Sequence, residues 1–68
     1  MKWQVTLFTD EDGFVVAECP ALPGCVSEGR TREEALHNVE EAIAACIEAR
    51  RELGLPVPTD MADVEVAA

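Results

Sequence analysis

The sequence predicts an α+β fold in which one long helix lies on one face of a small, mainly antiparallel sheet. Three observations predict it. Short segments with strand-like polarity occupy the first 28 residues, apolar residues recur at helical spacing from residue 32, and 68 residues suffice for one domain only. The expected order is β-β-β-α-β within a single domain that spans residues 1–68.

Three strands are expected before the helix. Residues 2–9 alternate between two faces, which is the period of a half-buried strand, and Gly13 readily supplies the positive φ of a hairpin turn. Residues 14–19 form the second strand. Two prolines and Gly24 then interrupt the ladder, and residues 25–28 form a short third strand.

A helix is expected over residues 32–53. Thr31 and Glu34 match a capping box, in which the threonine hydroxyl accepts from a first-turn amide and the glutamate reaches back to the cap. Gly54 suits a left-handed helix end, and Pro56 prevents continuation. The apolar stripe of this helix comprises Leu36, Val39, Ile43, Cys46 and Ile47.

The sheet is expected to have one uncovered apolar face. The alternation of residues 63–66 predicts a fourth, edge strand, but a single helix covers only one side of the sheet. Exposed apolar patches usually mark an interface, so we expect a homodimer, a higher homo-oligomer or a stable complex with another protein. The candidate residues of this partner or subunit interface are Trp3, Phe8, Phe14, Arg50 and Leu53.

Two of these residues have alternative roles. Arg50 projects along the apolar stripe, at the end of the helix expected to overhang the sheet. It either covers the edge of the core with its methylenes or pairs with a carboxylate across a subunit boundary. Trp3 is either a core anchor or an interface anchor.

The chain is strongly acidic, because 14 acidic against 5 basic residues give a formal net charge of -9. This field opposes direct binding to nucleic-acid phosphates or to an anionic membrane, and it favours encounter with a basic protein. The N-terminus lacks the apolar segment of a signal peptide, so a cytoplasmic location is expected. Cys19, Cys25 and Cys46 are therefore interpreted as small buried hydrophobes.

No catalytic residue, cofactor site or metal site is expected. The acidic loop around Asp10 and Asp12 does not have the ligand spacing of a calcium loop. His37 lies on the expected helix, with no nucleophile to activate. The enzyme alternative is a residual metal-dependent nuclease that would use Asp10, Asp12 and Glu18.

The chain contains three short motifs, at residues 20–25, 29–35 and 54–58. The first reads P-A-L-P-G-C, the second G-R-T-R-E-E-A and the third G-L-P-V-P. In their order and spacing they resemble the signature of the HicB-type antitoxin family, and the resemblance covers nearly the whole chain.

The resemblance implies a partial ribonuclease-H-like fold that has lost nuclease chemistry. It also implies that the chain neutralises a small basic toxin that cleaves messenger RNA. Longer family members carry a C-terminal DNA-binding module, and we expect this chain to be a stand-alone version without one. A self-assembling regulatory domain that has no toxin partner is the second alternative.

Overall fold

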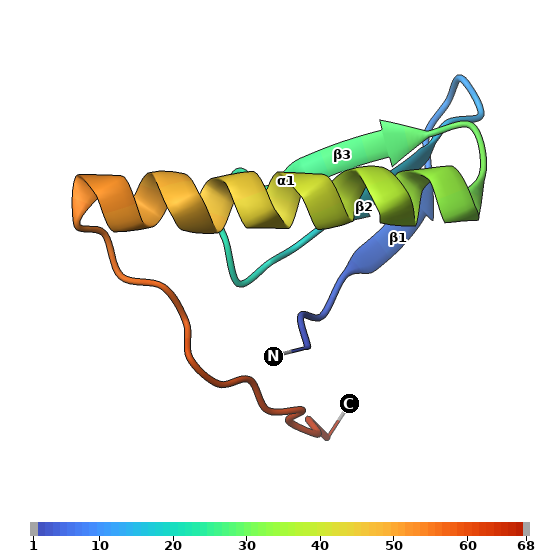
Figure 1. Ribbon diagram of the computed structural model, residues 1–68. Coiled ribbons are helices and arrows are strands. Elements are labelled where there is room, and N and C mark those ends of the chain that lie inside the picture. The colour runs from blue at the N-terminus through green and yellow to red at the C-terminus, as the bar shows by residue number, and fades with distance from the viewer. Residues whose placement is uncertain (1, 68) are drawn as a thin grey trace.

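The computed structural model describes residues 2–67 and shows a three-stranded antiparallel sheet followed by one long helix (Figure 1). The strands lie in the order β1-β2-β3, so β2 is central and β1 and β3 are the edges. The elements are β1 (Thr6–Thr9), β2 (Val15–Glu18), β3 (Val26–Gly29) and α1 (Arg32–Leu53). The predicted α+β class, the three strands and the bounds of the helix are confirmed.

The β1–β2 hairpin is closed by Asp10. Its backbone N–H donates to the Phe14 carbonyl at 2.9 Å, and its Oδ1 accepts from the backbone N–H groups of Asp12 and Phe14, each at 2.9 Å. Gly13 has a φ of 85°, a left-handed conformation that favours glycine. The register then pairs Thr9 with Val15.

The loop between β2 and β3 contributes to the core. Cys19 donates to the Cys25 carbonyl at 2.9 Å, and Cys25 donates to the Leu22 carbonyl at 2.9 Å, which folds the loop back on itself. This places Leu22 inside the molecule with no exposed surface. The sequence predicted only an interruption of the ladder here, because a leucine between two prolines gives no periodic signal.

Both ends of α1 have the caps that the sequence predicts. The Thr31 hydroxyl accepts from the Glu34 N–H at 3.1 Å, and Glu34 Oε1 accepts from the Arg30 N–H at 3.4 Å, one residue before the cap. At the other end Gly54 adopts a φ of 71°. Leu55 donates to the Arg50 carbonyl at 2.8 Å, which closes the last turn.

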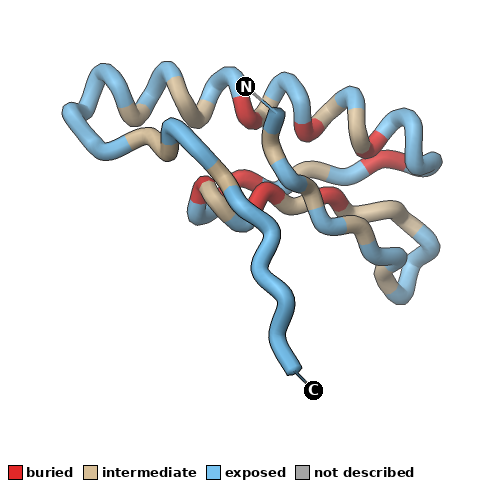
Figure 2. Tube along the Cα trace, turned by 90° about the horizontal axis from the view of Figure 1, so that it is seen from below, coloured by how far each residue is buried: buried red, intermediate tan, exposed pale blue. Residues whose placement is uncertain are grey.

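The core lies between α1 and the sheet (Figure 2). Its buried residues are Ala17, Cys19, Leu22, Cys25, Ala35, Val39 and Ile43. Gly29 allows the helix to approach β3 very closely, since a Cβ atom there would lie 2.5 Å from the Ala35 backbone nitrogen. The helix therefore packs on β3 and β2 and makes few contacts with β1.

Two expectations about strand length need correction. The first strand is limited to Thr6–Thr9, because β2 ends at Glu18 and leaves residues 2–5 without a neighbour to pair with. The predicted edge strand at residues 63–66 is not formed. A strand needs a partner for its backbone N–H and C=O groups, and this segment meets residues 2–9 through one side-chain hydrogen bond, from Gln4 to Asp63. The order is therefore β-β-β-α over the described residues.

Candidate functional site

The face of the sheet that points away from α1, here called the outer face, exposes apolar side chains. The register aligns Phe8, Val16 and Glu28 in one row across the three strands. Thr6, Glu18 and Val26 form the next row. Ala17 and Gly29 alternate with these residues and face the helix, so both rows lie on the opposite side. Phe8 is 53% exposed and Val26 49% exposed, which shows that the chain leaves this face open.

The predicted interface residues lie in three places. Phe8 and Phe14 have the parity of the outer face, where Phe8 is exposed and Phe14 half-buried. Trp3 has the opposite parity and packs half-buried against the core. Arg50 and Leu53 lie in the last turn of α1.

The end of α1 overhangs the sheet, as expected (Figure 1). Arg50 is half-buried there, and its Nη1 donates to the Pro56 carbonyl at 3.3 Å. This bond holds the chain where it leaves the helix, a role that the sequence did not indicate. Leu53, by contrast, is 74% exposed.

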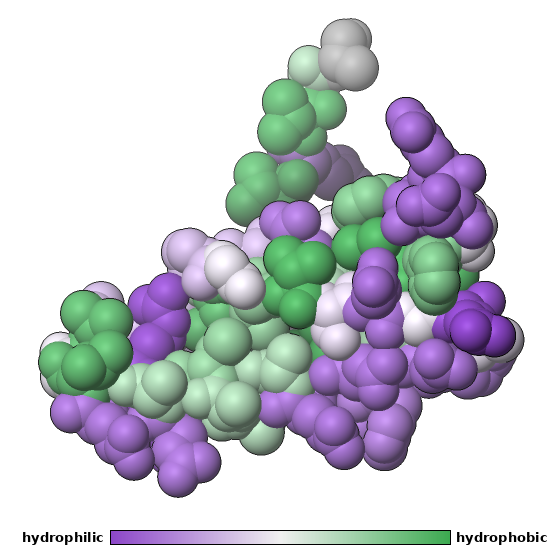
Figure 3. Space-filling model, turned by 90° about the horizontal axis from the view of Figure 1, so that it is seen from above, coloured by the Kyte–Doolittle hydropathy of each residue, from purple (hydrophilic) through white to green (hydrophobic). Residues whose placement is uncertain are grey.

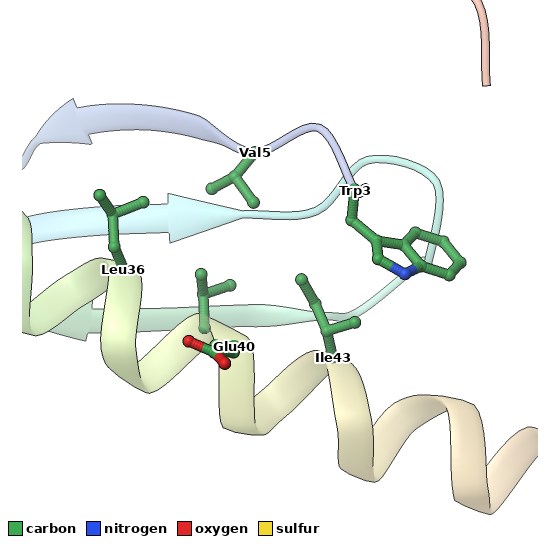
Figure 4. Close-up of a pocket in the computed structure, with 6 residues that line it drawn as sticks. Trp3, Val5, Leu36, Glu40 and Ile43 are labelled. Carbon is green, nitrogen blue, oxygen red and sulfur yellow. The ribbon is translucent and has the colours of Figure 1, made fainter. Parts of the chain in front are cut away.

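A groove runs between α1 and the segment that precedes β1 (Figure 4). Trp3 and Val5 project from that segment toward the helix, and Leu36 and Ile43 project from the helix toward the sheet. Its lining residues are Trp3, Val5, Leu36, Val39, Glu40 and Ile43, around a volume of about 230 Å³. The groove follows from the position of α1 over β3 and β2, which leaves the helix-facing side of residues 3–5 poorly covered. Sequence periodicity could not reveal it, because it depends on the lateral placement of the helix.

The exposed side of α1 is acidic. Between Arg32 and Arg50 the helix carries five glutamates, all exposed, and no lysine or arginine. Glu41 Oε1 lies 3.5 Å from His37 Nε2, and both side chains are exposed, so this contact is weakly stabilising at most.

The last residues of the segment that follows α1 project from the molecule (Figure 3), whereas Val57, Pro58 and Met61 in the same segment are half-buried. Val64 is 79% exposed and Val66 is 83% exposed. Val64 and Val66 are therefore accessible, and residues 55–67 have no regular secondary structure.

The cysteines are packing residues. Cys19 and Cys25 are buried, and Cys46 is half-buried. Burial raises the pKa of the Cys25 thiol to about 12, and a hydrogen bond with Cys46 and the electrostatic influence of Cys46 and Cys19 act in the same direction. Because the thiolate is the nucleophilic form, Cys25 is unreactive near neutral pH.

The carboxylates named for the nuclease alternative do not gather at one site. Asp10 is occupied with the hairpin turn, and Glu18 lies on the outer face. Across residues 2–67, no three histidine, cysteine, aspartate or glutamate side chains gather in a way that could hold a metal ion. Within the same span, no helix has the length and apolar character needed to cross a bilayer.

Comparison with known proteins agrees with the motifs and the fold. The model of a family described as "HicB_like antitoxin of bacterial toxin-antitoxin system" matches residues 3–68. This chain belongs to that HicB-like antitoxin family.

Several relatives of this HicB-like chain have similar length. The UPF0150 protein Ta0767 of Thermoplasma acidophilum is 46% identical over 63 residues, which cover 93% of this chain and 91% of the relative. The UPF0150 protein ssr1765 of Synechocystis is 43% identical over 59 residues, or 87% of this chain and 75% of the relative. A UPF0150 protein of Archaeoglobus fulgidus is 35% identical over 51 residues, or 75% of this chain and 74% of the relative. No solved structure matches significantly.

Proposed function

We propose that this chain is a non-catalytic antitoxin of the HicA/HicB type, which binds a small basic toxin and keeps it from cleaving messenger RNA. Membership of the HicB-like antitoxin family supports the class of function. A pair of this kind acts in the cytoplasm, where its messenger RNA target is found.

The observation that carries the proposal is the group of glutamates on the exposed side of α1. Residues 33–49 present five exposed glutamates and no lysine or arginine, in a chain whose formal net charge is -9. Such a field attracts a basic protein and raises its association rate. It also repels RNA, the substrate of the toxin.

The outer face supports self-association as a second part of the proposal. Phe8, Val16 and Val26 form an apolar patch that residues 2–67 leave uncovered. A two-fold partner with the same patch would bury it on both copies. We therefore propose a homodimer or higher homo-oligomer built on this face, with the acidic side of α1 left free for the toxin.

The direct test is co-expression with a small basic protein encoded beside this gene. We expect the two to co-purify, and we expect RNA cleavage by the purified toxin to stop when this chain is added in equimolar amount. The association rate should fall as ionic strength rises, because charge steers the encounter. An unrelated protein of equal positive charge serves as the control for non-specific attraction. Unchanged cleavage in the presence of excess chain would refute the proposal.

A further inference from the structure

We propose that the groove between residues 3–5 and α1 binds an extended segment of a basic protein, which inserts one large apolar side chain and places a lysine or arginine beside Glu40 (Figure 4). The inference rests on the proposed function, because the partner it describes is the toxin. It adds where the toxin is held and by what chemistry.

The size and lining of the groove fit a large apolar side chain. Its volume is about 230 Å³, and five of its six lining residues are apolar. An apolar cavity of about 150 Å³ already accepts a molecule as large as benzene. A phenylalanine or leucine from a partner therefore fits, and it would remove Trp3 and Leu36 from water.

The backbone beside the groove is free to pair. Residues 2–5 lead into β1, which is an edge strand, and in the described part of the chain no strand lies along its outer side. Extended peptides commonly bind by adding a strand to such an edge, with alternate side chains entering pockets. An added strand would direct every second side chain toward α1, the side on which the groove opens.

The charge of Glu40 favours a basic segment as the occupant of the groove. Glu40 is exposed and is the charged residue of an otherwise apolar lining, so it attracts a cation placed next to the inserted side chain. The chain's own C-terminal segment approaches through the Gln4–Asp63 hydrogen bond, but Asp63 and Glu65 flank Val64 and would bring negative charge toward Glu40. The same segment of a second copy of this chain would bring the same two carboxylates toward Glu40. A basic segment of another protein would bring positive charge toward Glu40 instead.

Trp3 is the sole tryptophan and lines the groove, so its fluorescence reports binding directly. The probe is a six-residue synthetic peptide with a central phenylalanine flanked by arginines and capped at both ends. Two matched peptides replace the phenylalanine by alanine or the arginines by glutamate. We expect a saturable shift of the Trp3 emission with the first peptide. Affinity should be at least about tenfold weaker for the alanine peptide, because the buried aromatic contact is lost.

Charge reversal on the helix separates the groove from the general acidic field. Glu40→Arg should weaken binding of the arginine peptide by about tenfold, whereas Glu52→Arg, in the last turn of the helix, should change it by less than about twofold. Both residues are exposed on α1, so both variants are expected to fold, and circular dichroism checks this. No saturable change in Trp3 emission, equal affinity for the three peptides, or equal effects of the two reversals would overturn the inference.

Inhibition of the toxin is measured separately with the same two variants. If the wild-type chain and Glu40→Arg inhibit RNA cleavage equally, the groove is not the toxin site, and the inference fails while the proposed function stands. If the peptides behave as expected but no toxin is inhibited, the groove is supported as a basic-segment site and the proposed function fails.

Discussion

At the scale of single residues, small side chains decide where the helix lies. Gly29 and Ala35 bring α1 onto β3, and this lateral shift opens the groove beside Trp3 and Val5. Gly29, the first residue of the second sequence motif, is therefore needed for the packing of the helix on the sheet. The same contact that stabilises the core creates the candidate binding site.

Gly29→Ala should destabilise the fold. The new Cβ would lie 2.5 Å from the Ala35 nitrogen and 2.8 Å from the Glu34 carbonyl carbon, both backbone atoms, so the helix must move away. We expect a loss of about 1–3 kcal/mol in the free energy of unfolding, as for other overpacked sites. Urea denaturation measures it, with Ser27→Ala on the same strand as the control. A stability equal to that of the wild type would contradict this account of the packing.

The Cys25 thiol should make stability fall at alkaline pH. Its pKa is raised from 9.0 to about 12 by burial and by its neighbours, so the folded state retains a proton that the unfolded state releases. The stabilisation is fully present below pH 9 and is lost as pH rises toward 12. Urea denaturation from pH 8 to 11 should show this decline, and the decline should be smaller in Cys25→Ala. Identical pH profiles for the two proteins would show that another group is responsible.

At the scale of elements, α1 is specified by its ends as much as by its apolar stripe. Thr31 and Gly54 fix the first and last turns, and Arg50 holds the exit through the Pro56 carbonyl. The strands depend on pairing with an adjacent strand. Residues 2–5 and 63–66 have strand-like sequences, but their backbone is not paired and they form no strand.

Thr31→Ala should remove the N-cap of α1. The alanine leaves the Glu34 N–H without the hydroxyl that accepts from it at 3.1 Å. We expect a cost of about 0.5–2 kcal/mol in the free energy of unfolding, measured by urea denaturation followed by circular dichroism at 222 nm. Thr59→Ala changes an exposed threonine after the helix and should be neutral. A loss equal in both variants would rule out a specific capping effect.

At the scale of the whole molecule, one helix and three short strands leave much apolar surface open. Phe8 and Val26 on the outer face, Leu53 at the end of α1, and Val64 and Val66 after it are all exposed. A domain of this size buries a smaller fraction of its surface than a larger domain does, so further contacts with another polypeptide have a large relative effect on its stability.

Phe8→Glu should weaken self-association. It places a carboxylate at the centre of the contact proposed for the outer face, in the same row as Glu28. Sedimentation equilibrium at tens of micromolar should show oligomers for the wild-type chain and a shift toward monomer for the variant. Ala45→Glu adds the same charge to an exposed position on α1 and should leave the oligomer intact. A monomeric wild-type chain would contradict the homo-oligomer proposal.

The sequence by itself determined the α+β class, the three strands, both caps of the helix and the presence of apolar side chains on both sheet faces, because each depends on neighbouring residues or on a short period. Only the tertiary structure decided that residues 63–66 have no strand partner, that Leu22 enters the core, and that α1 lies toward β3 and opens a groove beside residues 3–5. These outcomes depend on contacts between residues far apart in the chain, above all the close approach of Gly29 to Ala35 and the short extent of β2, which no local pattern encodes.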